Sequence, residues 1–346
     1  MSFSSVWNTV YPIIIAILFF ELIIIVHEGG HFAAARLMKI KVNEFSIGMG
    51  PKIFSFTKGE TKYSLRWILF GGYCAMEGED EASSEAGSFS SKSVPARMLV
   101  VVAGALMNLL LGFLIIVCII SNQNLVGTTT VAKFDDNAVS ASSGLMVGDT
   151  IKSIDGMRVF TATDVETGLT RSPDDTLSIT VERNGKIQTL EVKFQMEEYE
   201  GRKYVGMDFW LLGKEKTVGS VLKNSAATFV SYTRMVFLSV HDLLVGRYGL
   251  SDLSGPVGAV SVVSNAAKTS LNSLLRISAI LTINIGLFNL FPIPALDGWR
   301  FFLLLGEGVF RKKRPAKWEY AINAAGLAIL LGVMVLVTFS DVTKLF

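Results

Sequence analysis

The feature that most constrains this chain is a polar motif inside a long apolar segment near its start. Residues 23–32 read IIIVHEGGHF and contain an H-E-x-x-H motif. Residues four apart share one face of a helix, so His27 and His31 can hold one metal ion between them. Glu28 then lies beside the metal, where it can take a proton from a bound water. Such side chains are costly near hydrocarbon unless they are partnered, which favours a metal site over a chance match.

Two imidazoles leave a metal ion short of ligands, and the opposite end of the chain offers a third. Asp297 follows the apolar run of residues 274–291 and a turn that contains Pro292 and Pro294. The prolines end a helix and free backbone groups, which a metal cavity can satisfy. Asp297 is therefore the candidate third ligand.

The composition places the chain in a lipid bilayer. Half of the residues are hydrophobic, 18% are charged and the mean hydropathy is +0.46, well outside the soluble range. A net charge of +2 gives no indication of a nucleic-acid partner. Cys74 lies in a polar region and Cys118 in an apolar run, so neither a disulfide nor a cysteine metal site is expected.

The apolar runs predict four transmembrane helices, and the basic residues orient them. Arg36, Lys39 and Lys41 directly follow the first run, which marks its end as cytoplasmic and the N-terminus as extracytoplasmic. The motif lies near that end, so the active site is expected near the cytoplasmic side. A second basic cluster at residues 311–314 precedes the fourth run.

Several short motifs together carry a resemblance to a known family. Besides the H-E-x-x-H helix and L-D-G at residues 296–298, they are F-G-G-Y at 70–73, A-G-A-L-M-N at 103–108 and S-G-P-V-G at 254–258. Over nearly its whole length the chain resembles the site-2 protease family of intramembrane zinc metalloproteases, in the bacterial sigma-factor-regulating branch with a single PDZ domain. It departs from the family's usual residues at Gly29, Ala105 and Trp299, none of which is a ligand.

The resemblance implies an enzyme and a set of catalytic residues. Zinc, one ion per chain, is expected on His27, His31 and Asp297, with Glu28 as the general base. Asn289 is expected to donate a hydrogen bond to the substrate backbone or the oxyanion, although it could instead face the helix bundle. The implied activity is that of a zinc metalloendopeptidase, a hydrolase that performs regulated intramembrane proteolysis.

The resemblance also implies the substrate class and the location. The expected substrates are single-span membrane proteins such as anti-sigma factors, already trimmed by a site-1 protease, or remnant signal peptides. The expected location is the bacterial cytoplasmic (inner) membrane, with several crossings.

Residues 42–75 contain strand-like runs punctuated by glycines, which predicts short strands and a β-hairpin. One strand is expected over residues 63–70, and its sheet edge could pair with an unwound substrate segment. The alternative is a hairpin that only shapes the cytoplasmic mouth of the site. The candidate substrate-binding residues are Tyr63, Leu65, Trp67, Leu69, Gly71, Gly72, Tyr73 and Pro294. The acidic tract at 77–81 is expected to be a solvated loop.

A soluble domain is expected between the second and third helices. Its G-L-x-x-G-D-x-I-x-x-I-D-G run at residues 144–156 resembles bacterial PDZ domains. Such a domain either binds an extended peptide at a sheet edge or acts as a spacer that limits access. The apolar residues of 217–246 fall on one helical stripe interrupted by charges, which predicts a helix on the membrane surface.

The expected fold class is a polytopic α-helical membrane protein with four transmembrane helices, a cytoplasmic-side membrane-associated β-hairpin and an inserted extracytoplasmic PDZ domain (α+β). The segments are 1–41, first helix with the motif; 42–96, hairpin region and loop; 97–121, second helix; 122–213, PDZ domain; 214–270, amphipathic surface helix and Gly-Pro loop; 271–300, third helix; 301–317, basic cytoplasmic loop; and 318–346, fourth helix and C-terminus.

Two polar residues inside predicted helices have open roles. Glu21 precedes Glu28 by seven residues, on nearly the same face and about 10 Å away along the axis. It either lines a polar path to the metal or is protonated or bonded to a neighbouring helix. Asn108 is expected to bond the first or third helix.

Two other functions remain open. A metal-ion transporter also places His and Asp inside a membrane, but it needs ligands spread along a route. A catalytically idle PDZ scaffold would not need an intact set of catalytic residues. The discriminating observation is cleavage of a transmembrane substrate that depends on Glu28.

Overall fold

The computed structural model describes residues 3–79, 83, 85, 87–199, 202–247, 249, 253–311 and 316–344. The chain forms two compact units. One combines residues 1–115 with 236–346, and the other comprises residues 116–235. The predicted basic residues 312–314 and the acidic residues 80 and 81 lie outside the described residues.

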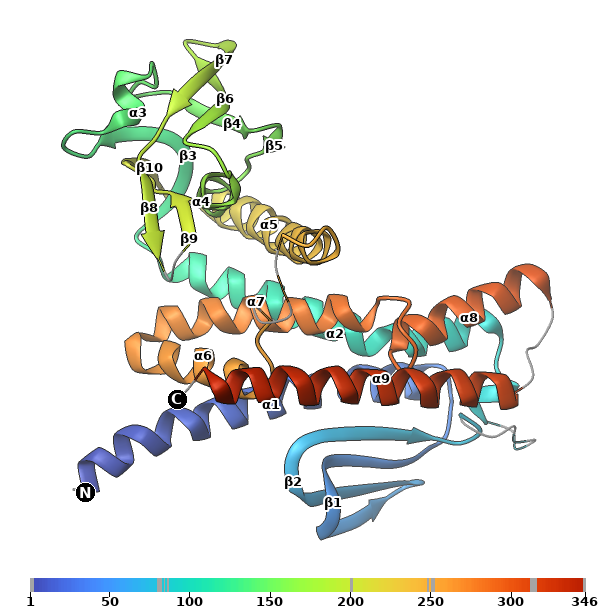
Figure 1. Ribbon diagram of the computed structural model, residues 1–346. Coiled ribbons are helices and arrows are strands. Elements are labelled where there is room, and N and C mark those ends of the chain that lie inside the picture. The colour runs from blue at the N-terminus through green and yellow to red at the C-terminus, as the bar shows by residue number, and fades with distance from the viewer. Residues whose placement is uncertain are drawn as a thin grey trace. The chain divides into compact units, whose positions relative to one another are not determined.

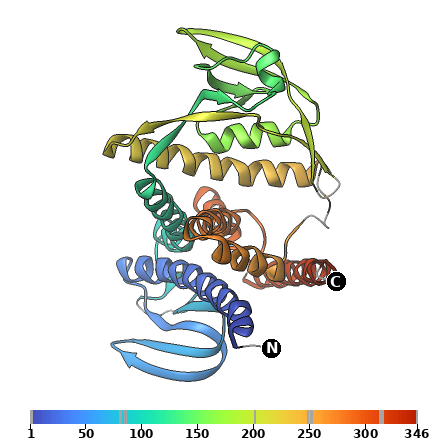
Figure 2. The same cartoon turned by 90° about the vertical axis from the view of Figure 1, so that its left-hand side faces the viewer.

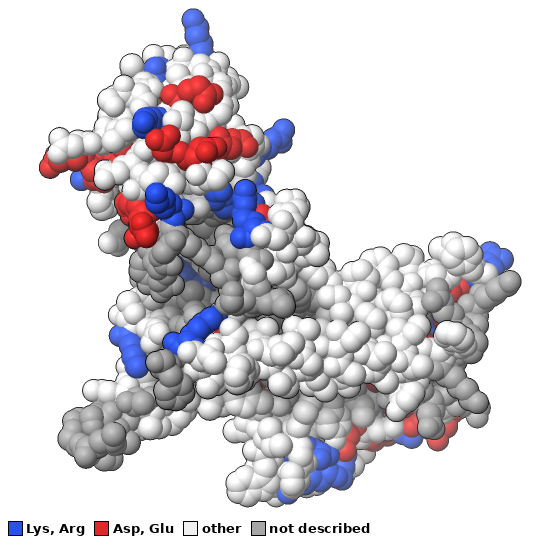
Figure 3. Space-filling model, in the orientation of Figure 1, with Lys and Arg blue, Asp and Glu red and all other residues white. Residues whose placement is uncertain are grey.

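Long apolar helices dominate the first unit (Figure 1). They are α1 (Phe3–Leu37), α2 (Val94–Asn122), α7 (Leu271–Asn289) and α9 (Ala316–Thr343). Each contains a window long and apolar enough to cross a membrane, which gives four candidate spans. In the space-filling view the surface over these helices carries few charged side chains (Figure 3). The four long apolar helices expected from the sequence are therefore present among the described residues, as candidates for crossing a membrane.

Small residues allow three of these helices to approach closely. A side chain on Gly30 of α1 would collide with the backbone carbonyl of Ala103 on α2. A side chain on Gly286 of α7 would press on the carbonyl oxygen of Ala105 at 3.1 Å. Close backbone contacts of this kind hold helices together where the surrounding lipid supplies no hydrophobic driving force. They bring the motif helix directly against α2.

The hairpin differs from the predicted short strands. It consists of two long strands, β1 (Val42–Lys58) and β2 (Thr61–Met76). Each strand bends at glycines with positive φ, for example Gly48 at 79° and Gly71 at 123°, a conformation that costs other residues energy. The glycines therefore bend continuous strands instead of ending them.

The bends fold the two strands into a sheet of four segments. Residues 44–47 pair with residues 62–65 on one side and with residues 72–75 on the other. Residues 62–65 pair in turn with residues 54–57. The segment order is therefore 52–58, 61–66, 42–47 and 72–76, and the last of these forms one edge of the sheet.

Two segments predicted as loops are helical. The predicted Gly-Pro loop contains α6 (Pro256–Thr269), which begins with Pro256 in its first turn, where proline is favoured. Asp341 of α9 accepts a hydrogen bond from the Gly258 amide at 2.8 Å and so satisfies a free donor at this helix end. Most of the first half of the predicted basic loop at 301–317 belongs to α8 (Asp297–Phe310). The basic cluster that follows led to the prediction of a loop, although the residues before it are mostly apolar.

Helix α8 is held by ion pairs at the surface of the first unit. Arg97 at the start of α2 donates to both carboxylate oxygens of Glu307, at 2.7 and 3.1 Å. Arg300 pairs with Glu79, just after β2. Because α8 begins at Asp297, these bidentate and charged contacts help to fix the candidate ligand in place.

The second unit is an α+β domain, seen from two sides in Figures 1 and 2. Its main sheet has the strand order β10-β3-β4-β6-β7, with β5 paired to β4, and β8 and β9 form a separate pair. The strands are β3 (Leu125–Phe134), β4 (Thr150–Ile154), β5 (Met157–Arg158), β6 (Thr176–Arg183), β7 (Lys186–Lys193), β8 (Met196–Tyr199), β9 (Arg202–Val205) and β10 (Phe209–Glu215). Short α3 (Val139–Ser142) and α4 (Ala162–Arg171) complete it. Fully buried Ile, Leu, Val and Phe side chains from the strands and α4 form its core.

The long helix α5 (Val218–Leu244) is tied to this domain by a buried polar cluster. Asp164, at the start of α4, accepts from Ser231 of α5 at 2.9 Å and pairs with Arg234. Thr161 caps α4, and its hydroxyl oxygen lies 3.2 Å from the hydroxyl oxygen of Ser231. Helix α5 is not among the four candidate spans of the described residues, and its place on the membrane surface stays a prediction.

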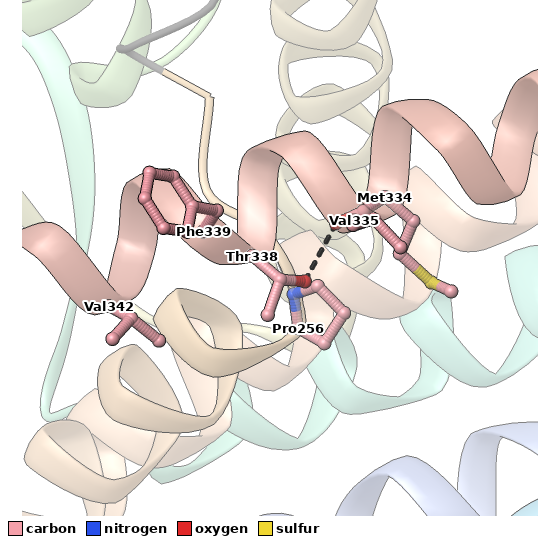
Figure 4. A pocket seen from close by; sticks show the side chains of 6 residues that line it. All are labelled: Pro256, Met334, Val335, Thr338, Phe339 and Val342. Carbon is pink, nitrogen blue, oxygen red and sulfur yellow. Dashed lines mark hydrogen bonds between the residues drawn. The ribbon is translucent and has the colours of Figure 1, made fainter.

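An apolar cavity of 380 Å³ lies between the start of α6 and the second half of α9 (Figure 4). The hydroxyl of Thr338 bonds to Met334 of its own helix at 2.7 Å. The cavity therefore presents hydrocarbon and no free polar group. It contains none of the predicted catalytic residues and is not the functional site.

Candidate metal centre

Three ligand atoms from opposite ends of the chain converge at one point of the first unit. The His27 Nε2 atom lies 3.2 Å from His31 Nε2. One oxygen of Asp297, Oδ2, lies 3.1 Å from His27 Nε2 and 3.3 Å from His31 Nε2. These are the predicted ligands, and among the described residues they form the group able to hold a metal ion.

Hydrogen bonds set the direction of the two imidazoles. The Nδ1 atom of His31 lies 2.8 Å from the Val100 carbonyl oxygen, so Nδ1 carries the proton and Nε2 turns its lone pair to the centre. The Asn108 amide lies 3.4 Å from His27 Nδ1. Its oxygen has no partner within the described part of the chain, and rotating the amide by half a turn would let it accept from His27. Asn108 thus contacts the first helix, one of its two predicted partners.

The mutual distances of 3.1, 3.2 and 3.3 Å are close to those between the ligand atoms of a zinc ion. A tetrahedral zinc ion with ligand bonds of about 2.0–2.2 Å separates neighbouring ligand atoms by about 3.3–3.6 Å. The Asp297 Oδ2 atom is buried and accepts no hydrogen bond from the residues that the structure describes, although two ring nitrogens face it. Lone pairs directed at one another require a cation between them. The residues present therefore fit a zinc ion with one open coordination position.

Asp297 reaches the centre because of the turn that precedes it. Ala295 adopts a positive φ of 77°, and the first turn of α8 packs on the end of α7. A side chain on Gly298 would collide with the backbone of Leu290 and Phe291. Glycine is therefore required directly after the ligand.

Pro294, predicted to bind substrate, packs elsewhere in this turn. A side chain on Gly326 of α9 would collide with its ring, so the ring lies directly against that helix. The Ala295 amide donates to Asn323 of α9 at 3.4 Å. These contacts support the turn from behind, and a substrate contact for Pro294 stays a prediction.

Glu28 faces the edge of the hairpin sheet. A side chain on Gly72 would lie 3.5 Å from Glu28 Cγ and 3.4 Å from a methyl group of Ile24. The backbone amide of Cys74 also lies beside the Glu28 carboxyl group. Burial raises the pKa of the Cys74 thiol to about 12, so this thiol is not a nucleophile at neutral pH.

The hairpin residues predicted to bind substrate do not share one position. Tyr63 and Leu65 lie on a segment that pairs on both sides, so this part of the predicted strand has no free edge for strand addition. Side-chain contact of these two residues with a substrate stays a prediction. Trp67 is 70% exposed and Leu69 is 37% exposed, near the bend. Gly72 and Tyr73 begin the edge segment beside Glu28, and Gly71 directly precedes it at the bend.

Sequence reasoning missed the network that holds this edge segment. Arg66 donates to Glu44 at 2.9 Å, to the Tyr73 hydroxyl at 2.6 Å and to the Gly50 carbonyl at 2.7 Å. Burial would raise the pKa of Glu44, but hydrogen bonds from Ser64 and Arg66 lower it to about 2. The network links the central, neighbouring and edge segments. The alternation of polar residues along both strands is the sequence pattern from which this network could have been predicted.

Asn289 is the last residue of α7 and is half-buried. It precedes Asp297 by eight residues, across the turn. Its proposed donation to the substrate or the oxyanion stays a prediction.

Gly104, in the A-G-A-L-M-N motif, is a further residue of the site whose role was not predicted from the sequence. A side chain there would collide with His31 Nε2 and approach His27 Cε1 at 2.9 Å. We expect Gly104→Ala to lower zinc affinity by about 10- to 100-fold, the usual effect of disturbing a ligand's support. Competition with a chromogenic chelator measures it. Gly29→Ala is the matched control, because a side chain there meets nothing within 4 Å. Equal zinc affinity in both variants would contradict this role.

Comparison with known proteins agrees with the geometry. The profile of Peptidase family M50 matches residues 15–333. A relative from Clostridium perfringens is 35% identical over 95% of this chain and 98% of its own length. The zinc metalloprotease RasP of Shouchella clausii is 28% identical over 94% of this chain and 97% of its own length. The regulator of sigma-W protease RasP of Bacillus subtilis is 28% identical over 97% and 99%. The chain belongs to peptidase family M50, the site-2 protease family of zinc metalloproteases.

Proposed function

We propose that this chain is an intramembrane zinc endopeptidase that cuts single-span membrane proteins of the anti-sigma-factor kind, with remnant signal peptides as a second class. The observation that carries the proposal is the convergence of His27, His31 and Asp297 beside Glu28. The two histidines and Glu28 lie on α1, which is apolar enough to cross a membrane. One relative is named as a regulator of sigma-W protease, which supports the substrate class.

Each residue has a separate task in this proposal. His27, His31 and Asp297 hold the zinc ion, which supplies a Lewis acid for the attacking water and the scissile carbonyl. Glu28 takes a proton from the attacking water and later gives it to the leaving amine. Asn289 donates to the substrate carbonyl oxygen as negative charge develops there. The hairpin edge excludes bulk water from one side of Glu28.

The proposed orientation follows the basic residues after α1. The N-terminus and the domain of residues 122–213, which we assign as a PDZ domain, lie outside the cell, and the zinc site lies near the cytoplasmic face of the inner membrane. A site-1 protease would first remove the outer domain of the substrate. Asp297 must reach the depth of His27 at the cytoplasmic side, which requires an even number of crossings between α2 and α7. A single crossing by α5 would place Asp297 at the opposite face, so we assign α5 to the membrane surface.

Cleavage by purified protein tests the function directly. In nanodiscs, the protein is incubated with a single-span substrate and the products are identified by mass spectrometry. We expect one internal cut that disappears with a zinc chelator and returns when zinc is restored. A transporter would move zinc across liposomes without cutting, and an idle scaffold would bind the substrate uncut. Either of these outcomes would contradict the proposal.

The domain of residues 122–213 of this protein is proposed to act as a size filter for substrates. Leu125 pairs directly with Glu215, so the chain enters and leaves the domain at one place, and a short Gly-Ser linker can replace residues 127–212. We expect this replacement to leave cleavage of trimmed substrates within about twofold, since the domain contributes no zinc ligand. Substrates with folded outer domains should become cleavable.

The comparison requires a graded series of outer-domain sizes, measured with both proteins. In the intact chain the cleavage rate should fall as size increases, and in the replaced chain it should not. A replaced chain that is folded, binds zinc and still rejects large substrates would refute the filter.

The edge segment of residues 72–76 is proposed to accept an unwound substrate strand. A transmembrane helix keeps its carbonyls in its own hydrogen bonds, and freeing them in lipid is costly unless another strand accepts them. We expect Cys74→Pro, which removes an amide beside Glu28, to raise KM about tenfold or more with zinc retained. Cys74→Ala is the control that keeps the amide. Equal KM values in the two variants would favour a hairpin that only shapes the mouth.

A further inference from the structure

Glu21 is a buried carboxyl group that the zinc chemistry does not use. It lies on α1 and is only 5% exposed. Neither of its oxygens has a hydrogen-bond partner among the residues that the structure describes. The carboxyl group faces the backbone amides of Gly48 and Gly71, at the bends of the hairpin, without bonding to either.

Its position is aligned with the catalytic residue. Along one face of α1, Glu21 faces Gly71, Ile24 faces Gly72, and Glu28 faces Cys74. The same edge segment of the sheet thus runs past both carboxyl groups. Seven residues of helix separate them by about 10 Å along the axis.

An unpartnered buried carboxyl group is costly in either protonation state. A buried polar group without a hydrogen bond loses about 1–3 kcal/mol, and a charged one loses more. An apolar side chain at residue 21 would remove this cost. The present arrangement therefore destabilises the contact between α1 and the hairpin, and it leaves an acceptor that a substrate donor can satisfy.

We propose that Glu21 is a specificity-determining residue that accepts a hydrogen bond from a donor side chain of the substrate. This inference rests on the proposed function, because it assumes that the edge segment moves away from α1, which it contacts at Gly72, and that a substrate strand then lies between them. An extended chain advances about 3.3 Å per residue, so about 10 Å corresponds to three residues. The substrate group that Glu21 contacts is a Gln, Asn, Ser, Thr or Lys side chain three residues from the scissile bond.

The test combines enzyme and substrate variants. The cut is mapped in an all-Leu single-span substrate, and Gln is then placed three residues from the bond on each side in turn. In the wild-type protein, Gln on one side should raise kcat/KM about tenfold, the effect of one hydrogen bond to such a carboxyl group. In Glu21→Met that preference should disappear. Leu22→Met is the matched control, because Leu22 is 50% exposed on the same helix.

Two further measurements separate positioning from packing. The zinc content of Glu21→Met should equal that of the wild type, and its melting temperature should be equal or higher, because an unsatisfied group has been removed. A preference for Gln that persists in Glu21→Met overturns the proposal, and so does a lowered melting temperature with unchanged substrate preference. Glu21→Gln, which keeps the volume, should show a weakened preference and serves if Glu21→Met does not fold.

Failure of the underlying function gives a different result. If the wild-type protein cuts no transmembrane substrate, the proposed function fails and the role of Glu21 falls with it. If the wild type cuts with equal rates at every donor position, only the role of Glu21 is refuted.

Discussion

Glu28→Gln should bind one zinc ion per chain and cleave about a thousandfold more slowly than the wild type. The side chain is not one of the converging ligands, so its amide analogue leaves the metal centre intact. An amide cannot take a proton from water, and general acid–base catalysis contributes about 10²- to 10⁴-fold. The loss should appear in kcat, with little change in KM.

Single-turnover cleavage and zinc content, measured on the same preparation, test this expectation. Glu28→Asp is the informative companion, because it keeps the base and withdraws it by one methylene. It should recover part of the rate. Loss of zinc in Glu28→Gln would contradict the assignment of Glu28 as base, since it would make Glu28 a ligand.

The membrane part of the fold was largely predictable because its signals are local. An 18-residue apolar window is a long pattern, and all four candidate spans fall where the sequence placed them. The H-E-x-x-H spacing likewise fixes two ligands on one helical face. Asp297 was predictable as well, because proline breaks a helix directly before it and a carboxylate there needs a partner.

The elements that were wrong depend on contacts between distant segments. Helix α8 was predicted as a loop because a basic cluster follows it in the sequence. The ion pair that holds this helix joins Arg97 and Glu307, which are 210 residues apart in the chain, so no local pattern indicates it. The edge position in the hairpin depends on register. Tyr63 lies between Phe45 and Phe56, and alternation along a strand shows which face a residue takes but not which strands flank it.

The glycines of the centre show the same limit. Gly104 and Gly298 appear in the sequence as parts of short motifs, but their role is the absence of a side chain where His31 or the end of α7 comes close. A sequence states that a residue is small, and only the fold states what would occupy the space. Gly29, two positions from His31, faces open space and has no such constraint.

Asp297→Ala should lose its zinc ion during purification while the four spans stay folded. His27→Ala and His31→Ala, each made as a single variant, should do the same. With one carboxylate removed, two imidazoles remain, which is one protein ligand fewer than catalytic zinc sites use. Cleavage should fall to the level of the chelated wild type. Metal analysis after size-exclusion chromatography gives the stoichiometry, and circular dichroism reports the helices.

Gly298→Ala distinguishes the position of the ligand from its presence. This variant keeps every ligand, but its new methyl group would collide with the backbone of Leu290 and Phe291, so the first turn of α8 must shift and carry Asp297 with it. We expect a weakened zinc affinity, with Gly332→Ala on α9 as the control, because a side chain there meets nothing within 4 Å. Full zinc stoichiometry in Asp297→Ala would refute the third ligand. Wild-type affinity in Gly298→Ala would show instead that the turn adapts, because a site that tolerates a shift in α8 is not held rigidly by the end of α7.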